Sequence, residues 1–158
     1  MSDVQLIESA QATEVASLRI PVTDKYLLLP SVSVAEIVGF TPPKVVDNTP
    51  VWMMGIISWR ETEVPLLCWE VLTGGSQPEP DSFQRIVVLN NTGLNDDLPF
   101  IALAAQGIPH LERVTTELIE QDTSAELNAF ELMAVDVAGS HAYIPNIAAL
   151  EQAYLDLS

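Results

Sequence analysis

Short apolar runs separated by turn-forming residues are the feature that most restricts the fold of this chain. Runs rich in β-branched residues or leucine alternate with Pro, Gly, Asn and Asp along most of the sequence, and this pattern favours strands over helices. Strands are predicted at residues 15–20, 26–29, 34–38, 52–59, 64–69, 85–89, 100–105, 111–114, 131–137 and 142–144. So many short strands are typical of small barrels or of a sandwich. The sequence therefore predicts a mainly β fold.

Helix is predicted near the C-terminus. Asn146 can cap it, and Ile147, Leu150 and Tyr154 fall near one face at helical spacing, which is typical of a helix that packs on a core. The acidic stretch at residues 115–129 predicts either a weaker helix or a loop.

The composition limits the size, the partners and the location of the protein. With 158 residues, of which 48% are hydrophobic, the chain can bury a core without disulfides, so we expect a flexible N-terminus over residues 1–13 and a single domain over residues 14–156. Acidic residues outnumber basic ones by 22 to 6, and a net charge of −16 would repel nucleic acid and anionic membranes. No signal peptide and no membrane-spanning stretch is recognisable, so a cytoplasmic protein without direct membrane insertion is predicted.

A search for catalytic chemistry finds no supporting motif. His110 and His141 lack metal-ligand spacing, and Gly74-Gly75 lacks the lysine and the helix start of a phosphate-binding loop. Cys68, the only cysteine, stands among apolar neighbours that predict a buried, reduced thiol. We therefore predict no catalytic residue, no metal site and no cofactor. Carboxylates are plentiful, so an acid pair assembled from distant parts of the chain stays open.

The stretch MMGIISWRETEVPLLCWE, residues 53–70, predicts a β-hairpin with residues 60–63 at its tip and Arg60 pointing outward. Both arms are apolar at nearly every position, so both faces are covered, either by a second layer of the protein or by a partner. A core hairpin with a solvated tip and a binding edge both fit this pattern. Trp59 and Arg60 are residue types enriched at the energetic centres of interfaces, and Pro65 suits an edge strand.

Several segments form a series that extends over most of the chain. LLLPSVSVAEIV (27–38) is followed by a proline-rich loop, by WMMGIISWR (52–60) and by EVPLLCWEVLTGG (63–75). The series continues through RIVVLN (85–90) and FIALAAQGIPHLERV (100–114) to a terminal strand and helix. Together these segments resemble the CheW family of chemotaxis coupling proteins, with its Val-x-Glu-Ile segment, its Gly-Val-x-x-x-Arg-Gly hairpin and its Val-Pro-Val/Leu strand. Residues 59–70 are similar to the ChpC type of chemosensory systems for type IV pili.

The resemblance implies a fold, a function and a set of contact residues. The fold is a pair of small five-stranded β-barrel subdomains packed on one another, with a C-terminal helix. The function is that of a non-enzymatic adaptor between the cytoplasmic tip of a chemoreceptor and the regulatory domain of a CheA-type histidine kinase. By position, Val34, Glu36 and Arg60 correspond to the receptor-contacting surface, and the neighbouring Trp59 and Glu61 complete the predicted partner-binding set.

Two positions depart from the family pattern. Glu61 stands where the family has glycine, and if its φ is positive, the side chain costs about 1–2 kcal/mol. Trp69-Glu70 stands where the family has an aspartate-leucine pair, which moves the acid by one place.

Two other functions stay open. One is a small β-barrel hydrolase that uses an acidic pair, and the other is a structural subunit whose apolar hairpin makes a homodimer. A deep polar pocket with two close carboxyl groups would favour the hydrolase, whereas a shallow apolar groove would favour the adaptor.

Overall fold

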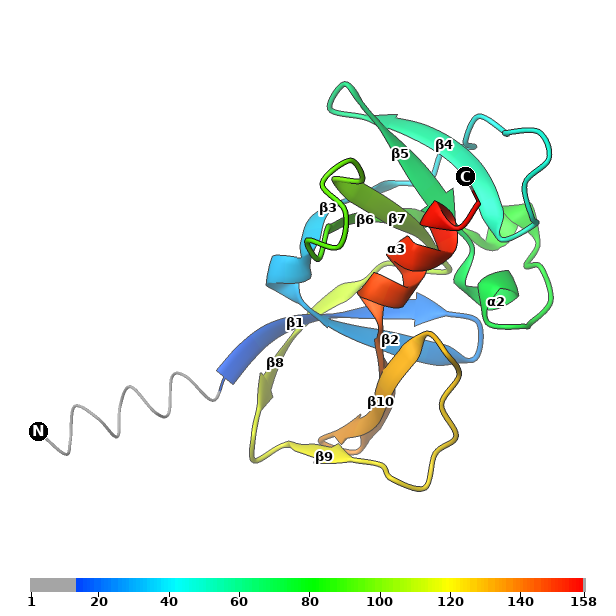
Figure 1. The fold of residues 1–158 in the computed structure, drawn as a ribbon. Coiled ribbons are helices and arrows are strands. Elements are labelled where there is room, and N and C mark those ends of the chain that lie inside the picture. The colour runs from blue at the N-terminus through cyan, green and yellow to red at the C-terminus, as the bar shows by residue number, and fades with distance from the viewer. Residues whose placement is uncertain (1–13, 158) are drawn as a thin grey trace, which may run out of the picture.

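Two twisted β-sheets make up most of the structure, a computed structural model that describes residues 14–157 (Figure 1). The six-stranded sheet has the order β8-β1-β2-β11-β10-β9, and the five-stranded sheet has the order β3-β6-β7-β5-β4. The six-stranded sheet contains β1 (Glu14–Val22), β2 (Lys25–Pro30), β8 (His110–Thr115), β9 (Ile119–Gln121), β10 (Glu131–Val137) and β11 (Ser140–Pro145). The five-stranded sheet contains β3 (Val34–Gly39), β4 (Met53–Trp59), β5 (Thr62–Leu67), β6 (Arg85–Asn90) and β7 (Phe100–Ala105). The helical elements are η1 (Ser31–Ser33), α2 (Trp69–Leu72), η2 (Pro80–Ser82) and α3 (Ile147–Leu155).

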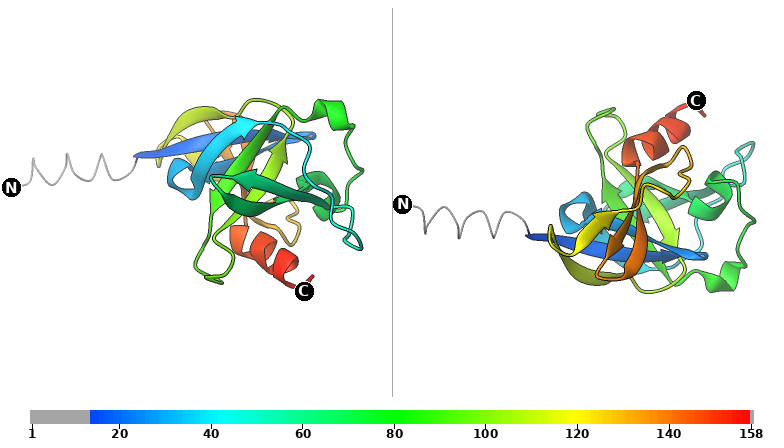
Figure 2. Two further views of the ribbon diagram at one scale, coloured as in Figure 1. Left: turned by 90° about the horizontal axis from the view of Figure 1, so that it is seen from above. Right: turned by 90° about the horizontal axis from the view of Figure 1, so that it is seen from below.

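The described part of the chain begins in the six-stranded sheet, crosses to the other sheet for β3 to β7, and then returns. The return places β11 parallel to β2, with Tyr143 opposite Leu27. In the view from below, the blue N-terminal strands accordingly lie beside the orange C-terminal strands (Figure 2). Both ends of the described chain therefore contribute to one sheet.

The predicted mainly β architecture, with two packed β subdomains and a C-terminal helix, is confirmed. In detail the two sheets differ in size, and within residues 14–157 no backbone ladder joins the two edge strands of either sheet. The domain prediction for residues 1–13 lies outside the described residues.

The region at residues 115–129 contains no helix and is a loop over most of its length, as one of the two predicted alternatives has it, but the prediction missed a short strand. It contains a strand, β9, which pairs with β10 through Gln121 opposite Val135 and Ile119 opposite Val137. Ile119 packs against a small core inside the six-stranded sheet. Because this segment carries only a weak helical pattern, the tertiary pairing decides its structure.

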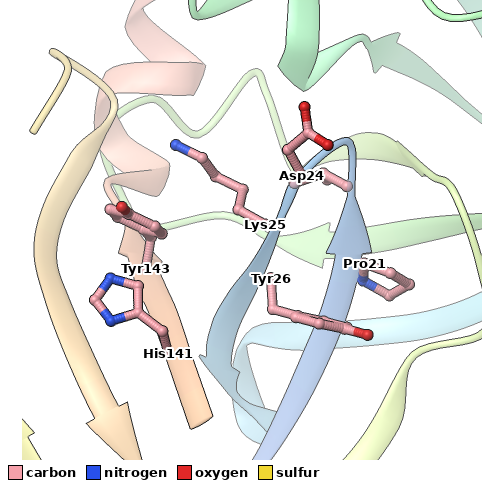
Figure 3. A pocket seen from close by; sticks show the side chains of 7 residues that line it. Pro21, Asp24, Lys25, Tyr26, His141 and Tyr143 are labelled. Atoms are coloured by element: carbon pink, nitrogen blue, oxygen red, sulfur yellow. The ribbon is translucent and has the colours of Figure 1, made fainter.

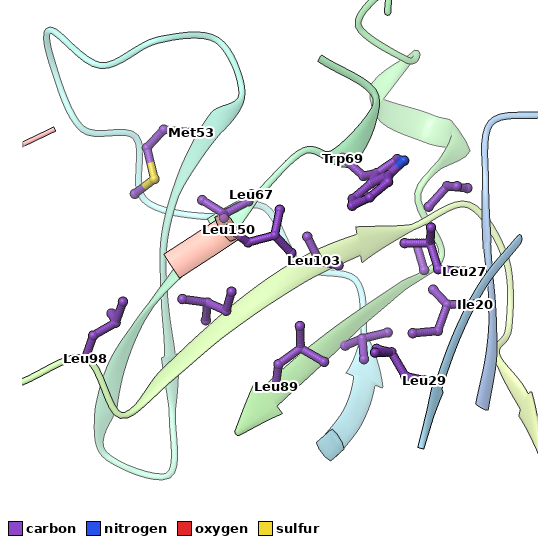
Figure 4. Packing of buried hydrophobic residues seen from close by; sticks show 14 residues of the cluster. Ile20, Leu27, Leu29, Met53, Leu67, Trp69, Leu89, Leu98, Leu103 and Leu150 are labelled. Carbon is purple, nitrogen blue, oxygen red and sulfur yellow. The ribbon is translucent and has the colours of Figure 1, made fainter. Parts of the chain in front are cut away.

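One large apolar core lies between the sheets and includes α3 (Figure 4). Its buried members come from both sheets, from the segments that flank them and from the helix: Ile20, Val22, Leu27, Leu29, Met53, Leu67, Trp69, Val87, Leu89, Leu98, Ile101, Leu103, Ala105 and Leu150. Two smaller cores lie within the individual sheets. The near-continuous apolar strands β6 and β7 thus have both faces covered, as their sequences indicate.

The helix α3 confirms the prediction near the C-terminus. The Asn146 side chain accepts a hydrogen bond from Ala149 N at 3.1 Å, as an N-cap does. Leu150 is fully buried in the shared core. The buried Glu151 carboxylate accepts hydrogen bonds from the backbone and the hydroxyl of Thr92, which fixes α3 to the loop between β6 and β7.

The expectation that Pro65 marks an edge strand is wrong, because β5 lies between β4 and β7. The parallel pairing with β7 includes only Leu66 and Leu67 of β5. Pro65 therefore stands one residue before that pairing begins, and its missing N–H removes no bond from it.

The edge strand β4 is partly covered by the proline-rich loop. Lys44 and Ile56 exchange two backbone hydrogen bonds of 2.9 Å, outside the named strands. Gly55 makes this approach possible, because a Cβ atom there would lie 2.4 Å from the Lys44 carbonyl oxygen. Its φ of +147° also suits glycine.

Candidate functional site

The tip of the β4–β5 hairpin is a two-residue turn, shorter than the predicted tip of residues 60–63. Trp59 pairs directly with Thr62, and the turn residues Arg60 and Glu61 have φ values of 47° and 63°. Positive φ at both positions is the signature of a type I′ turn, whose twist matches that of the flanking strands. Glu61 therefore has the positive φ that makes a non-glycine residue unfavourable at this position, where the family has glycine.

Three of the five predicted partner-binding residues meet at this tip. Trp59 Nε1 donates a hydrogen bond to Glu36 Oε1 at 2.9 Å, and Arg60 Nη2 lies 3.2 Å from the same oxygen. The Arg60 guanidinium carbon lies 4.9 Å from the centroid of the Trp59 ring, within cation–π range. We call Glu36, Trp59 and Arg60 the tip cluster. Since β3 and β4 are opposite edges of the five-stranded sheet, the cluster bridges its two edges.

The tip cluster is accessible to a partner. The Arg60 side chain is 69% exposed and the Glu36 side chain 39% exposed, in agreement with the prediction that Arg60 points outward. The positive charge of Arg60 is nevertheless paired with the carboxylate of Glu36. The sequence did not predict this ion pair. The exposed surface of the tip is therefore a balanced ion pair held on an aromatic ring.

Val34 and Glu61, the two remaining predicted residues, lie close to the cluster along the chain. Val34 begins β3 and packs, half-buried, against the core shared by the two sheets. Glu61 is exposed in the turn. Phe100 was not predicted, and its ring meets the Trp59 ring edge-on with centroids 4.8 Å apart. Phe100 is 41 positions away in the chain, so only the packing of β7 brings the two rings together.

A cavity of about 430 Å³ adjoins the tip cluster between the end of β3 and β4. It is lined by Val38, Gly39, Thr41, Pro42, Ile56, Ile57, Ser58, Trp59 and Ile86. None of these lining side chains is charged. The hollow is therefore uncharged, and its lining combines apolar residues with the polar residues Thr41 and Ser58.

A larger apolar concavity, which we call the loop groove, follows the proline-rich loop. One part, of about 510 Å³, lies between this loop and residues 77–83, and a second, of about 200 Å³, extends to the end of α3. Val46, Thr49 and Met53 line both parts, and no charged side chain lines either one. Val45 and Val51 are 75% and 58% exposed there. Such a patch is typical of a surface that binds another protein.

A pocket of about 390 Å³, lined by both charged and apolar side chains, lies beside the β1–β2 turn and β11 (Figure 3). Lys25 crosses it toward Tyr143, with the Lys25 nitrogen 4.1 Å from the ring centroid and 2.8 Å from Glu131 Oε2. His141 lies 3.9 Å from Asp122, whose pKa is held below its ordinary value by hydrogen bonds from Ser124.

A second pocket, of about 440 Å³, has two carboxyl groups in its lining, those of Asp24 and Glu70. Glu70 is buried, and its Oε2 accepts hydrogen bonds from Thr23 and Gln106. A carboxylate held in this way has a structural role, so the pocket does not favour the hydrolase.

Residues 14–157 offer no metal site, no membrane-spanning helix and no exposed thiol. Across this range no three His, Cys, Asp or Glu side chains are grouped so as to hold a metal ion. No helix in the same range is long and apolar enough to cross a membrane. Cys68 is buried, as predicted, and burial raises the pKa of its thiol to about 11.

Comparison with known proteins adds independent information. The model of the CheW-like domain family matches residues 17–153. A crystal structure of the scaffolding protein TtCheW from Thermoanaerobacter tengcongensis is similar in fold, with a TM-score of 0.69 over 83% of this chain and 88% of that chain, at 17% sequence identity. No curated protein sequence matches the chain significantly. Since the family model covers most of the sequence, this chain belongs to the CheW-like domain family.

Proposed function

We propose that this protein is a non-enzymatic adaptor of a bacterial chemosensory pathway. It would act in the cytoplasm, without a cofactor, and would couple the cytoplasmic tip of a chemoreceptor to the regulatory domain of a CheA-type histidine kinase. The pattern of residues 59–70 supports a pathway that serves type IV pili and twitching motility. Family membership and the accessible tip cluster support the adaptor over the hydrolase and over the homodimeric structural subunit.

The observation that carries the proposal is the tip cluster itself. A guanidinium, an indole and a carboxylate are held together at an exposed hairpin tip, beside an uncharged hollow. Trp and Arg are the types that most often dominate binding energy, and a rigid strand pair presents them with little loss of entropy. We assign Val34, Glu36, Trp59, Arg60 and Glu61 to the receptor-binding surface.

An adaptor also needs a second surface that can be occupied at the same time. The loop groove shares no residue with the tip cluster, and its exposed valines can be buried by a partner. Only Pro42 and Ile56 line both the groove and the hollow beside the tip cluster. We assign it to the kinase regulatory domain. Transient interfaces of this kind bury on the order of 1,200 Å² or less, which two modest surfaces can supply.

Two single substitutions test the assignment. Arg60→Glu should abolish co-migration with a receptor-tip fragment and leave binding of the kinase regulatory domain intact. Val45→Asp should do the reverse, because a carboxylate in the loop groove must be desolvated on binding. Both side chains are exposed, so the fold should survive both substitutions. Arg60→Glu should lower the melting temperature slightly, because it replaces the ion pair with Glu36 by a contact between two carboxylates.

The charge-swapped variant Arg60→Glu with Glu36→Arg decides how the ion pair acts. Recovery of receptor binding would mean that the pair matters only through its internal contact. Continued loss would mean that the partner reads the individual charges or that binding needs the carboxylate that accepts the hydrogen bond from Trp59. If neither single substitution affected either partner, the assignment of both surfaces would be wrong.

A further inference from the structure

The geometry of the hairpin tip points to Trp59 as a positioning residue. We infer that Trp59 holds the carboxylate of Glu36 and the guanidinium of Arg60 in register, and that these two groups make the polar contacts with the partner. The indole ring serves as their support. The contact of these two groups with a partner rests on the proposed function. The positioning of Glu36 and Arg60 by Trp59 does not depend on it.

The hydrogen bond from the indole is the first support. Trp59 Nε1 donates to the same Glu36 oxygen that pairs with Arg60, at 2.9 Å against 3.2 Å. Oε1 thereby receives two donors, and the other oxygen of Glu36 is left for a partner. A carboxylate on an exposed strand edge would otherwise rotate among several orientations, because an exposed ion pair alone holds it weakly.

The position of the ring is the second support. Trp59 is half-buried and packs against the core inside the five-stranded sheet, with Phe100 edge-on to it at 4.8 Å. Arg60 lies over the outward side of this fixed ring. The ring therefore connects the exposed guanidinium to the immobile core.

The backbone of the turn is the third support. Arg60 and Glu61 both occupy left-handed backbone without glycine, which is unfavourable for each of them. Contacts made by the Arg60 side chain with Trp59 and Glu36 stabilise this conformation. In this chain, which lacks the turn glycine of its family, Trp59 takes over part of the task of keeping the tip in shape.

NMR on the free full-length protein tests the inference without a partner. The order parameter of the Arg60 Nε–H bond should be above about 0.8 in the wild type and below about 0.6 in Trp59→Phe, which keeps an aromatic ring but loses the donor. The matched control is Trp52→Phe, the same exchange at a ring that packs against the shared core, and it should leave Arg60 unchanged.

A spectroscopic signature separates positioning from simple packing. The indole N–H resonance of Trp59 should keep its shift in Glu36→Gln, which retains an acceptor oxygen, and should move in Glu36→Ala. If Arg60 stayed rigid in Trp59→Phe, or if the indole resonance ignored both Glu36 variants, the inference would be overturned even if the melting temperature fell.

The binding arm uses the receptor-tip fragment that tests the proposed function. Trp59→Phe should weaken its affinity by about tenfold, the equivalent of one charge-assisted hydrogen bond. A fragment that fails to bind the wild type counts against the proposed function alone. A fragment that binds wild type and Trp59→Phe equally well counts against the inference alone.

Discussion

Glu70 accepts hydrogen bonds from both the backbone N–H and the hydroxyl of Thr23, at 2.8 and 3.0 Å. Glu70 lies in α2, after the five-stranded sheet, and Thr23 lies in the turn between β1 and β2. One buried carboxylate therefore connects the two halves of the structure, with Gln106 Nε2 as a third donor at 3.2 Å. This gives a physical role to the acid that the chain carries one place away from the family position.

Glu70→Ala should lower the free energy of unfolding by about 2–3 kcal/mol, because the protein loses three hydrogen bonds to a buried, charged acceptor. Glu70→Gln should cost less, about 1–2 kcal/mol, because its amide oxygen can still accept. Urea denaturation measures both values. Glu79→Gln, an exposed acid, is the matched control and should stay within about 0.5 kcal/mol of the wild type. Equal stabilities for Glu70→Ala and Glu79→Gln would contradict the role of Glu70.

Gly55→Ala should separate the proline-rich loop from β4. The new methyl group would stand 2.4 Å from the Lys44 carbonyl oxygen, so the two backbone bonds between Lys44 and Ile56 must break. We expect a loss of about 2–4 kcal/mol in the free energy of unfolding and faster amide exchange at Ile56. Gly39→Ala is the control, because nothing lies within 4 Å of its added methyl group. A tolerated Gly55→Ala would show that the loop is not held by this contact.

Glu61→Gly should stabilise the protein by up to about 1 kcal/mol, since relief of the left-handed strain exceeds the entropy lost by glycine. Glu61→Val should have the opposite sign, because a β-branched side chain is least tolerated at positive φ. Thermal unfolding of the two variants beside the wild type checks the order of stability. The reverse order would mean that the turn does not adopt the left-handed conformation.

The Cys68 thiol should be unreactive in the folded protein near neutral pH. Burial, followed by the nearby Glu70 carboxylate, raises its pKa from 9.0 to about 11, so the thiolate is scarce at pH 8. Between these two values the unfolded chain loses the thiol proton and the folded chain keeps it. The free energy of unfolding should therefore fall as the pH rises from 9 toward 11.

Cys68→Ala isolates this effect from the other groups that titrate in the same range. The difference in stability between wild type and Cys68→Ala should change with pH only above about pH 9. A thiol reagent should label the wild type at pH 8 only after denaturant is added. Rapid labelling of the native protein would show that the thiol is accessible.

The sequence by itself determined the class of fold, the positions of ten strands, the capped C-terminal helix and the family. These features follow from local patterns, because strand runs, turn residues and an N-cap act over a few neighbouring positions. The outward position of Arg60 also followed, since a hairpin tip between two apolar arms faces solvent. The expected strain at Glu61 also followed from the sequence, because a two-residue hairpin turn requires positive φ there.

Only the tertiary structure decided which distant groups meet. Glu36 reaches Trp59 and Arg60 because curvature of the sheet brings the edges β3 and β4 together, and no spacing in the chain encodes that curvature. The same holds for β9, whose strand conformation comes from pairing with β10, and for β5, whose inner position comes from its parallel contact with β7. At the tip cluster, at β9 and at β5, the energy of long-range packing exceeds the weak local conformational preference. The structure of each therefore depends on residues that are far apart in the sequence.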